Sequence, residues 1–248
     1  MIKNINKLRD YYLIFCFYSL IGWIYEVLWM RFIVPPYRWI NRGVLIGPFL
    51  PIYGIGMLIL WILLKKIKSK KHLASNKLYL FISIIVITTF LFITVVEYST
   101  PKIFHVDIFL KKYGLLLIIC NLIVLGIAYQ ITKKNKKIRT TDVTWIIIFL
   151  LIWIITTLIE YVSHYMIETY SNKLLWDYTK DFLNINRRVN WDASRNFAIG
   201  GTLLLYFIQP ILDKYVINNK NIIKNIITII IVIPTLLDFI FHVLLKIV

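Results

Sequence analysis

The stretch from residue 78 to residue 98, LYLFISIIVITTFLFITVVEY, decides the fold class, because it holds a single charged residue, Glu97. A helix needs about 20 mostly apolar residues to cross the hydrocarbon core of a bilayer. Comparable stretches recur along all 248 residues, which are 59% hydrophobic, with a mean hydropathy of +0.74. This composition excludes an ordinary soluble domain. The sequence therefore predicts an all-α, polytopic membrane protein that forms one integral membrane domain, residues 1–248.

Seven apolar segments are expected to cross the membrane, and their limits carry an error of a few residues. They are residues 11–30, 44–64, 78–98, 114–132, 144–166, 196–212 and 225–246. The last segment contains Pro234, Asp238 and His242, so a protein with six spans is the alternative.

The distribution of basic residues predicts that the N-terminus lies inside. With seven alternating spans, residues 1–10, 65–77, 133–143 and 213–224 face the cytoplasm and hold more than half of the 29 Lys and Arg. This bias follows the positive-inside rule. It accounts for the net charge of +17 without a nucleic-acid partner. The abundance of Ile, Lys and Asn favours a bacterial protein, and hence a multi-pass protein of the plasma membrane.

Three carboxylates lie toward the external ends of predicted spans: Glu26, Glu97 and Glu160. An ionised carboxylate costs about 2.5–3.5 kcal/mol at mid-membrane and less near the interface. These side chains should therefore face the bundle interior, where external arginines are natural partners. They act either as binding groups or as simple ion-pair and capping residues.

Glu160, His164 and Glu168 follow one another at a spacing of four residues, which places them on one stripe of a helix. Carboxylates and a histidine in this arrangement would suit a divalent metal. No second histidine lies nearby in the sequence. We therefore favour a hydrogen-bonded polar stripe, and we assign no metal and no cofactor.

The segment NRGVLIGPFLPIYGIG, residues 41–56, contains two prolines and four glycines. These residues predict that the outer half of the second span is not a regular helix. Irregular backbone at membrane depth must be packed against protein or line a wet cavity. We expect a functional cavity here, with a packing kink as the alternative.

A second polar cluster follows the fifth span. It consists of Trp176, Asp177, Tyr178, Phe182, Asn184, Asn186, Arg187, Arg188, Trp191 and Asp192. Aromatic belts at the membrane surface explain the Trp and Tyr residues. They do not explain the interspersed Asp, Asn and Arg, which predict an external cap over the bundle.

These motifs together resemble a bacterial family, the putative ABC-transporter type IV (CmpB-type) membrane proteins. The resemblance rests on Gly22-Trp23-x-x-Glu26, on the segment 41–56, on Glu160-Tyr161 with Glu168, and on Trp176-Asp177-Tyr178 with Asn184-x-Asn186-x-Arg188. It covers roughly residues 13–60 and 155–195. Arg187 stands where the family pattern has a glycine, which puts the expected tight turn in question. Residues 65–145 match nothing in the pattern.

The residues and the resemblance favour a permease-like transport protein with a polar, outward-facing cavity. The candidate binding residues are Glu26, Asn41, Arg42, Gly43, Gly47, Pro48, Pro51, Tyr53, Gly54, Glu160, Glu168, Trp176, Asp177, Tyr178 and Arg188. The resemblance implies the membrane subunit of an ABC-type transporter. Because the sequence contains no Gly-x-x-x-x-Gly-Lys-Ser/Thr phosphate loop, such a subunit needs a separate ATPase.

Two other functions stay open at this point. The first is a membrane enzyme that acts on a lipid or lipid-linked substrate at the external interface, with Glu160, His164, Glu168 and Asp177 as acids, bases or metal ligands. The second is a non-catalytic assembly or sensor protein. No nucleophile signature is present, so an enzyme is the less favoured function and no catalytic residue is assigned.

Overall fold

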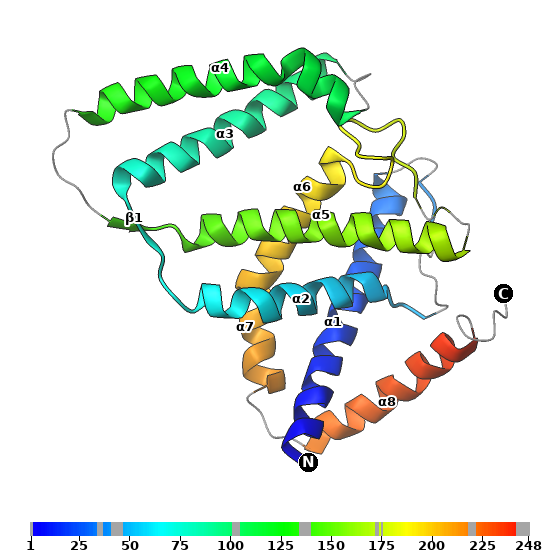
Figure 1. Cartoon of the computed structure of the whole chain (residues 1–248). Coiled ribbons are helices and arrows are strands. Elements are labelled where there is room, and N and C mark those ends of the chain that lie inside the picture. Colours follow the sequence, from blue (N-terminus) through cyan, green and yellow to red (C-terminus); the bar gives the residue numbers. More distant parts are fainter. Residues whose placement is uncertain are drawn as a thin grey trace. The chain divides into compact units, whose positions relative to one another are not determined.

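The computed structural model of the chain describes residues 2–33, 37–40, 47–100, 105–133, 140–171, 174, 176–217 and 222–241. Its main helices are α1 (Ile2–Phe32), α2 (Pro51–Lys68), α3 (Asn76–Ser99), α4 (Val106–Lys133), α5 (Thr144–Ser171), α6 (Trp191–Leu203), α7 (Gln209–Leu212) and α8 (Ile222–Phe239). Two π-helical turns, η1 (Leu204–Ile208) and η2 (Asp213–Ile217), flank α7. The described part of every predicted apolar segment lies mainly on these helices (Figure 1). The all-α prediction is confirmed.

Four helical segments are long and apolar enough to cross a membrane. They are Asn6–Phe32, Asn76–Ser99, Val106–Gln130 and Thr144–Tyr170, found among the described residues. The helix α2 has 18 residues and carries three lysines in its last turn, while the helix from α6 to η2 is divided by π-helical turns. The count of seven spans therefore stays a prediction.

The chain divides into two compact units. The first comprises Met1–Leu63 and Leu203–Val248. Within this unit, α1 packs against α2. The N-terminal part of α1 also contacts α8, where Lys224 Nζ lies 3.4 Å from the Asp10 carboxylate. Tyr18 donates a hydrogen bond of 2.8 Å from its hydroxyl to Gln209 Oε1. α1 therefore contacts three other helices of the unit, α2, α7 and α8.

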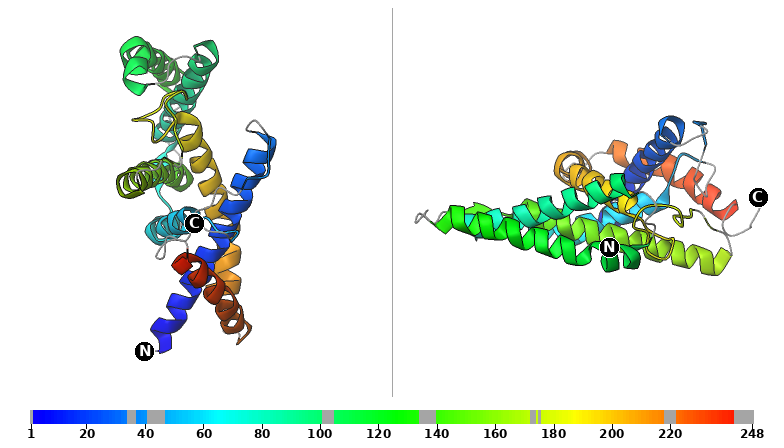
Figure 2. Two further views of the ribbon diagram at one scale, coloured as in Figure 1. Left: turned by 90° about the vertical axis from the view of Figure 1, so that its right-hand side faces the viewer. Right: turned by 90° about the horizontal axis from the view of Figure 1, so that it is seen from above.

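The second unit comprises Leu64–Thr202. Its helices α3 and α4 form an antiparallel hairpin, which the right-hand view shows from the side (Figure 2). The strands β1 (Leu73–Ser75) and β2 (Thr140–Asp142) pair antiparallel, with Leu73 opposite Asp142, just before α3 and α5 begin. At the other end of the hairpin, a cluster of buried side chains joins α3 and α4 to the loop before α6: Ile93, Val96, Phe109, Phe182 and Leu183. The sequence did not predict the two strands.

Three long-range contacts within the units join chain segments that the alternating topology places on the same side. The strands β1 and β2 belong to links predicted inside, as do Asp10 and Lys224. Glu97 and Arg195, 3.8 Å apart, both belong to ends predicted outside. The contacts are thus compatible with the predicted orientation.

Candidate functional site

The irregular part of the second segment is shorter than the sequence predicts. The helix α2 begins at Pro51, and Gly54 and Gly56 both lie inside it, so the prediction of irregular backbone as far as residue 56 is wrong. Proline suits the first turn of a helix, where its missing N–H has no intrahelical partner. Of the residues before Pro51, Gly47 and Pro48 lie in a bend. The candidates Asn41, Arg42 and Gly43 lie outside the described residues.

A carboxylate and a tyrosine meet between α1 and α2 in the first unit. The Tyr53 hydroxyl donates a hydrogen bond of 2.5 Å to Glu26 Oε1. Gly22 makes this possible, because a Cβ at that position would overlap the Tyr53 side chain. The candidate Gly54 is buried against the same helix, and a Cβ there would lie 2.6 Å from the backbone oxygen of Phe15. Gly22 and Gly54 therefore set the close approach of α1 and α2.

Asp238 is a polar contact of the irregular segment that sequence reasoning missed. The Gly47 N–H donates a hydrogen bond of 2.7 Å to Asp238 Oδ2, on α8. The Asp238 carboxylate thus accepts a hydrogen bond from a backbone N–H of the irregular segment. The signal was present in the sequence, since Asp238 is an acid within an apolar segment, but nothing there indicates its partner.

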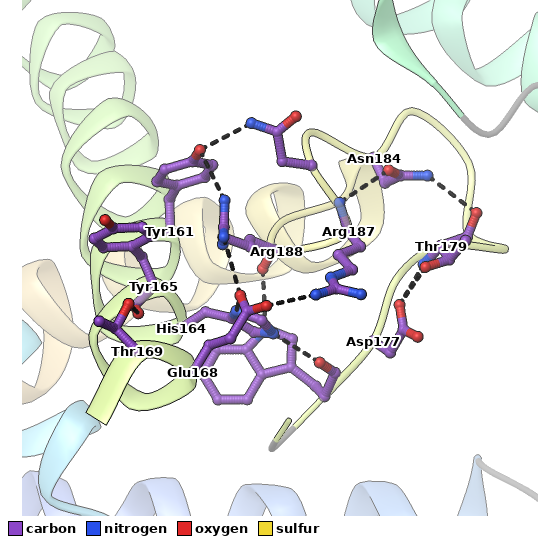
Figure 3. A network of polar contacts seen from close by, with 12 residues as sticks. Tyr161, His164, Tyr165, Glu168, Thr169, Asp177, Thr179, Asn184, Arg187 and Arg188 are labelled. Carbon is purple, nitrogen blue, oxygen red and sulfur yellow. Dashed lines mark hydrogen bonds and ion pairs between the residues drawn. The ribbon is translucent and has the colours of Figure 1, made fainter. Parts of the chain in front are cut away.

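In the second unit, the loop of residues 176–190, which we call the external cap after the side that the sequence predicts for it, is tied to α5 by an ionic network (Figure 3). Arg187 and Arg188 donate to the two carboxylate oxygens of Glu168 at 2.5 and 3.0 Å. The Arg188 guanidinium also lies 5.3 Å from the Tyr161 ring centre and 5.1 Å from that of Tyr165, both on α5. Such cation–π contacts add to the ion pair. Glu168 and Arg188 therefore belong to one network.

A second set of contacts seats the cap deeper on α5. The His164 ring nitrogen Nε2 lies 2.8 Å from the Trp176 carbonyl oxygen, and Trp176 Nε1 donates to the Arg188 carbonyl oxygen at 2.9 Å. The Tyr178 hydroxyl donates to Glu160 Oε1 at 3.0 Å. His164 and Glu160 are buried, with 2% and 5% of their surface exposed. The polar stripe predicted on α5 is thus the seat of the cap.

The geometry does not gather a metal site from this stripe. His164 Nδ1 lies 3.7 Å from Glu168 Oε2, but both oxygens of Glu168 already accept hydrogen bonds from arginine. Across the described ranges, no group of three or more His, Cys, Asp or Glu residues is placed to hold an ion.

Asp177 accepts hydrogen bonds from the Thr179 hydroxyl and N–H, which hold the pKa of its carboxyl below the usual range.

The tight turn in the cap forms although Arg187 replaces glycine. Asn186 and Arg187 have φ angles of 50° and 57°, and around them the Ile185 N–H donates to the Val189 carbonyl oxygen at 2.9 Å. A left-handed conformation costs about 1–2 kcal/mol for a residue other than glycine. Arg187 keeps it while its side chain holds Glu168.

This compensation gives a prediction for two substitutions of one residue. Arg187→Ala loses the ion pair and keeps the strained φ angle, whereas Arg187→Gly loses the ion pair and removes the strain. The glycine variant should therefore be more stable than the alanine variant, by about 1 kcal/mol. Thermal unfolding of both purified variants in the same detergent measures the difference. Equal midpoints would show that the turn is not strained.

Long apolar helices with ionisable side chains near their ends define an α-helical membrane protein. More particularly, the chain belongs to the family described as Putative ABC-transporter type IV, whose model matches residues 13–113 and 102–243. This confirms the resemblance seen in the sequence and extends it across the middle region, 65–145, which motifs alone did not place. No curated protein and no solved structure matches the chain.

Proposed function

We propose that the protein is the membrane subunit of an ABC-type transporter and that it binds a solute at the external ends of its helices. The observation that carries the proposal is a repeated pair. Glu26 and Glu160, each on an apolar spanning helix, accept a hydrogen bond from a tyrosine, Tyr53 and Tyr178 respectively. Carboxylates within membrane spans are costly and usually mark a solute or ion pathway.

The pairing suits reversible binding of a solute. A tyrosine hydroxyl keeps a carboxylate hydrogen-bonded in the empty protein, which limits the cost of burying the charge. A solute that carries an amine or hydroxyl group would replace the tyrosine as donor. Glu26 in the first unit and Glu160 in the second are then separate candidate contacts, each of which selects for such donors, while Glu168 and Arg188 keep the external cap in place.

The enzyme alternative receives less support from the contacts. Glu168 is held by two arginines, His164 is 2% exposed, and Asp177 accepts from the neighbouring Thr179. A general acid or base must reach the substrate atom whose proton it transfers. The family description likewise favours transport, with ATP hydrolysis supplied by a separate subunit.

Uptake into membrane vesicles tests this function. Vesicles that contain the full chain and its ATPase are offered a panel of labelled amino acids, sugars and amines, with and without ATP. At least one probe should accumulate with ATP, and Glu26→Gln or Glu160→Gln should lower its uptake by about tenfold, the cost of losing one charge-assisted hydrogen bond.

Glu97→Gln is the matched control, because Glu97 lies at the same end of a spanning helix but is 3.8 Å from Arg195 and forms no part of the proposed site. Its uptake should stay close to that of the wild type. The proposal fails if no probe accumulates with ATP, or if Glu26→Gln and Glu160→Gln transport as well as Glu97→Gln.

A further inference from the structure

The β1–β2 ladder is an ordered structure within links that the sequence treats as simple connectors. Besides the strand pairing, the Val143 N–H donates to the His72 carbonyl oxygen at 2.9 Å. The Thr144 hydroxyl donates to Asp142 at 2.5 Å, and its oxygen accepts from the His72 N–H at 2.9 Å. The Ser75 hydroxyl caps α3 by accepting from the Leu78 N–H at 3.3 Å. The ladder is therefore fixed to the first turns of α3 and α5.

Its position along the helices places the ladder at a membrane surface. The spanning segment of α3 begins at Asn76, directly after β1 ends. That of α5 begins at Thr144, with one residue between it and the end of β2. Twenty-four helical residues, the length of the α3 segment, extend roughly 36 Å. A hydrocarbon core is about 30 Å thick, and the headgroup layers lie on either side of it. The ladder consequently falls within a headgroup layer.

The side chains around the ladder suit that layer. Leu73 and Leu78 are 62% and 50% exposed, and Trp145, in the first turn of α5, is 51% exposed. Tryptophan at this depth is typical of the membrane–water interface. These apolar side chains would contact the upper parts of the lipid chains, and they anchor the ladder beside the headgroups.

The charge at the ladder is strongly positive. Residues 64–78 contain no acidic residue and six lysines: Lys65, Lys66, Lys68, Lys70, Lys71 and Lys77. Lys66, Lys70 and Lys71 are exposed. The nearby Asp142 accepts hydrogen bonds from the Thr144 hydroxyl and N–H, which hold the pKa of its carboxyl below the usual range. Its single negative charge does not offset the lysines.

From this geometry we propose that the ladder and its lysines form a binding surface for anionic phospholipid headgroups of the inner leaflet. The proposal depends on the predicted orientation with the N-terminus inside, and it is independent of solute transport. Clusters of four to eight basic residues directly beside a spanning helix bind anionic lipids, and each basic residue near the surface strengthens binding by about fivefold. A protein partner, such as the ATPase, fits less well, because Lys70 and Lys71 lie just before the ladder and Lys77 just after its first strand, so these charges belong to the segment that lies beside the headgroups.

Lipid retention tests the proposal. The full chain is purified in mild detergent from liposomes that mix phosphatidylglycerol with phosphatidylcholine, and the retained lipids are measured by mass spectrometry. The wild type should be enriched in phosphatidylglycerol, and Lys66/Lys70/Lys71→Gln should lose most of that enrichment. The same triple change to arginine should keep it. The matched control is Lys111/Lys112/Lys180→Gln, three lysines predicted to lie outside, which should leave the enrichment unchanged.

Salt and a soluble headgroup provide checks on the wild type alone, should the glutamine variant fold poorly. Enrichment should fall as sodium chloride is added, because salt screens exposed charges, and glycerol phosphate should not replace the lipid. Enrichment that is absent or insensitive to salt overturns the proposal. The proposal also fails if both glutamine variants lose the phosphatidylglycerol enrichment equally. It fails as well if Lys66/Lys70/Lys71→Gln keeps the lipid but, when purified from cells, no longer co-purifies with an ATPase.

Discussion

Among glycine-to-alanine substitutions at the glycines described above, Gly54→Ala should lower the stability of the protein most. The new Cβ would lie 2.6 Å from the Phe15 carbonyl oxygen and would also overlap the Ser19 hydroxyl. Backbone cannot swing aside as a flexible side chain can, so α1 must move away from α2. Overpacking of this kind costs typically 1–3 kcal/mol and occasionally more. The thermal unfolding midpoint in detergent measures the loss.

Gly56→Ala is a control on the same helix. A Cβ at Gly56 meets nothing within 4 Å, and alanine in place of glycine favours a helix by about 1 kcal/mol. This variant should therefore be as stable as the wild type or slightly more stable. If both substitutions lower the midpoint equally, the close contact between α1 and α2 is not present.

Trp176→Ala is the second change with a large expected effect, because it removes two side-chain contacts of the external cap and weakens a third, backbone contact. The indole donates to the Arg188 carbonyl oxygen and packs edge-on against His164, with ring centres 5.1 Å apart. Its loss would also loosen the Trp176 carbonyl that meets His164. Truncation of a buried Trp costs about 3–5 kcal/mol, and we expect the lower part of that range for this partly buried side chain.

The effect should be local to the external cap. Hydrogen exchange of the amides in residues 176–190 should speed up by at least tenfold, since 1.4 kcal/mol already corresponds to that factor. Trp145→Ala, which removes a 51% exposed tryptophan at the opposite end of α5, serves as the control and should leave the cap amides unchanged. Unaltered exchange in Trp176→Ala would mean that the ionic network alone holds the cap.

The helices were predictable from the sequence because a bilayer imposes the same demand on every span. Apolar length alone placed α3 and α5. The clustered polar residues indicated an ordered segment, which the structure ties to α5, whereas its external position stays a prediction. Partners were not predictable: Tyr53 and Glu26 are separated by 27 positions, and only the close approach at Gly22 brings them together. Three-residue strands such as β1 are too short to give a periodic signal.

The irregular segment shows a different limit. The sequence-based prediction treats proline and glycine alike as helix breakers, yet Pro51 starts α2 and Gly54 lies within it. The same residue types serve a helix when proline occupies the first turn and glycine faces a neighbouring helix. The role of each proline or glycine depends on its position relative to the start of α2 and to α1. The sequence shows that these residues are present, but it does not show these positions.

The central claim is that the candidate binding residues of each unit lie near the external face of the membrane. Its most direct test is labelling of intact cells with a membrane-impermeant maleimide, in a background with Cys16→Ser and Cys120→Ser. Gly47→Cys and Asp177→Cys should be labelled in intact cells, and Lys70→Cys should be labelled only after the membrane is permeabilised. Labelling of Lys70→Cys in intact cells, with Gly47→Cys and Asp177→Cys protected, would contradict the account.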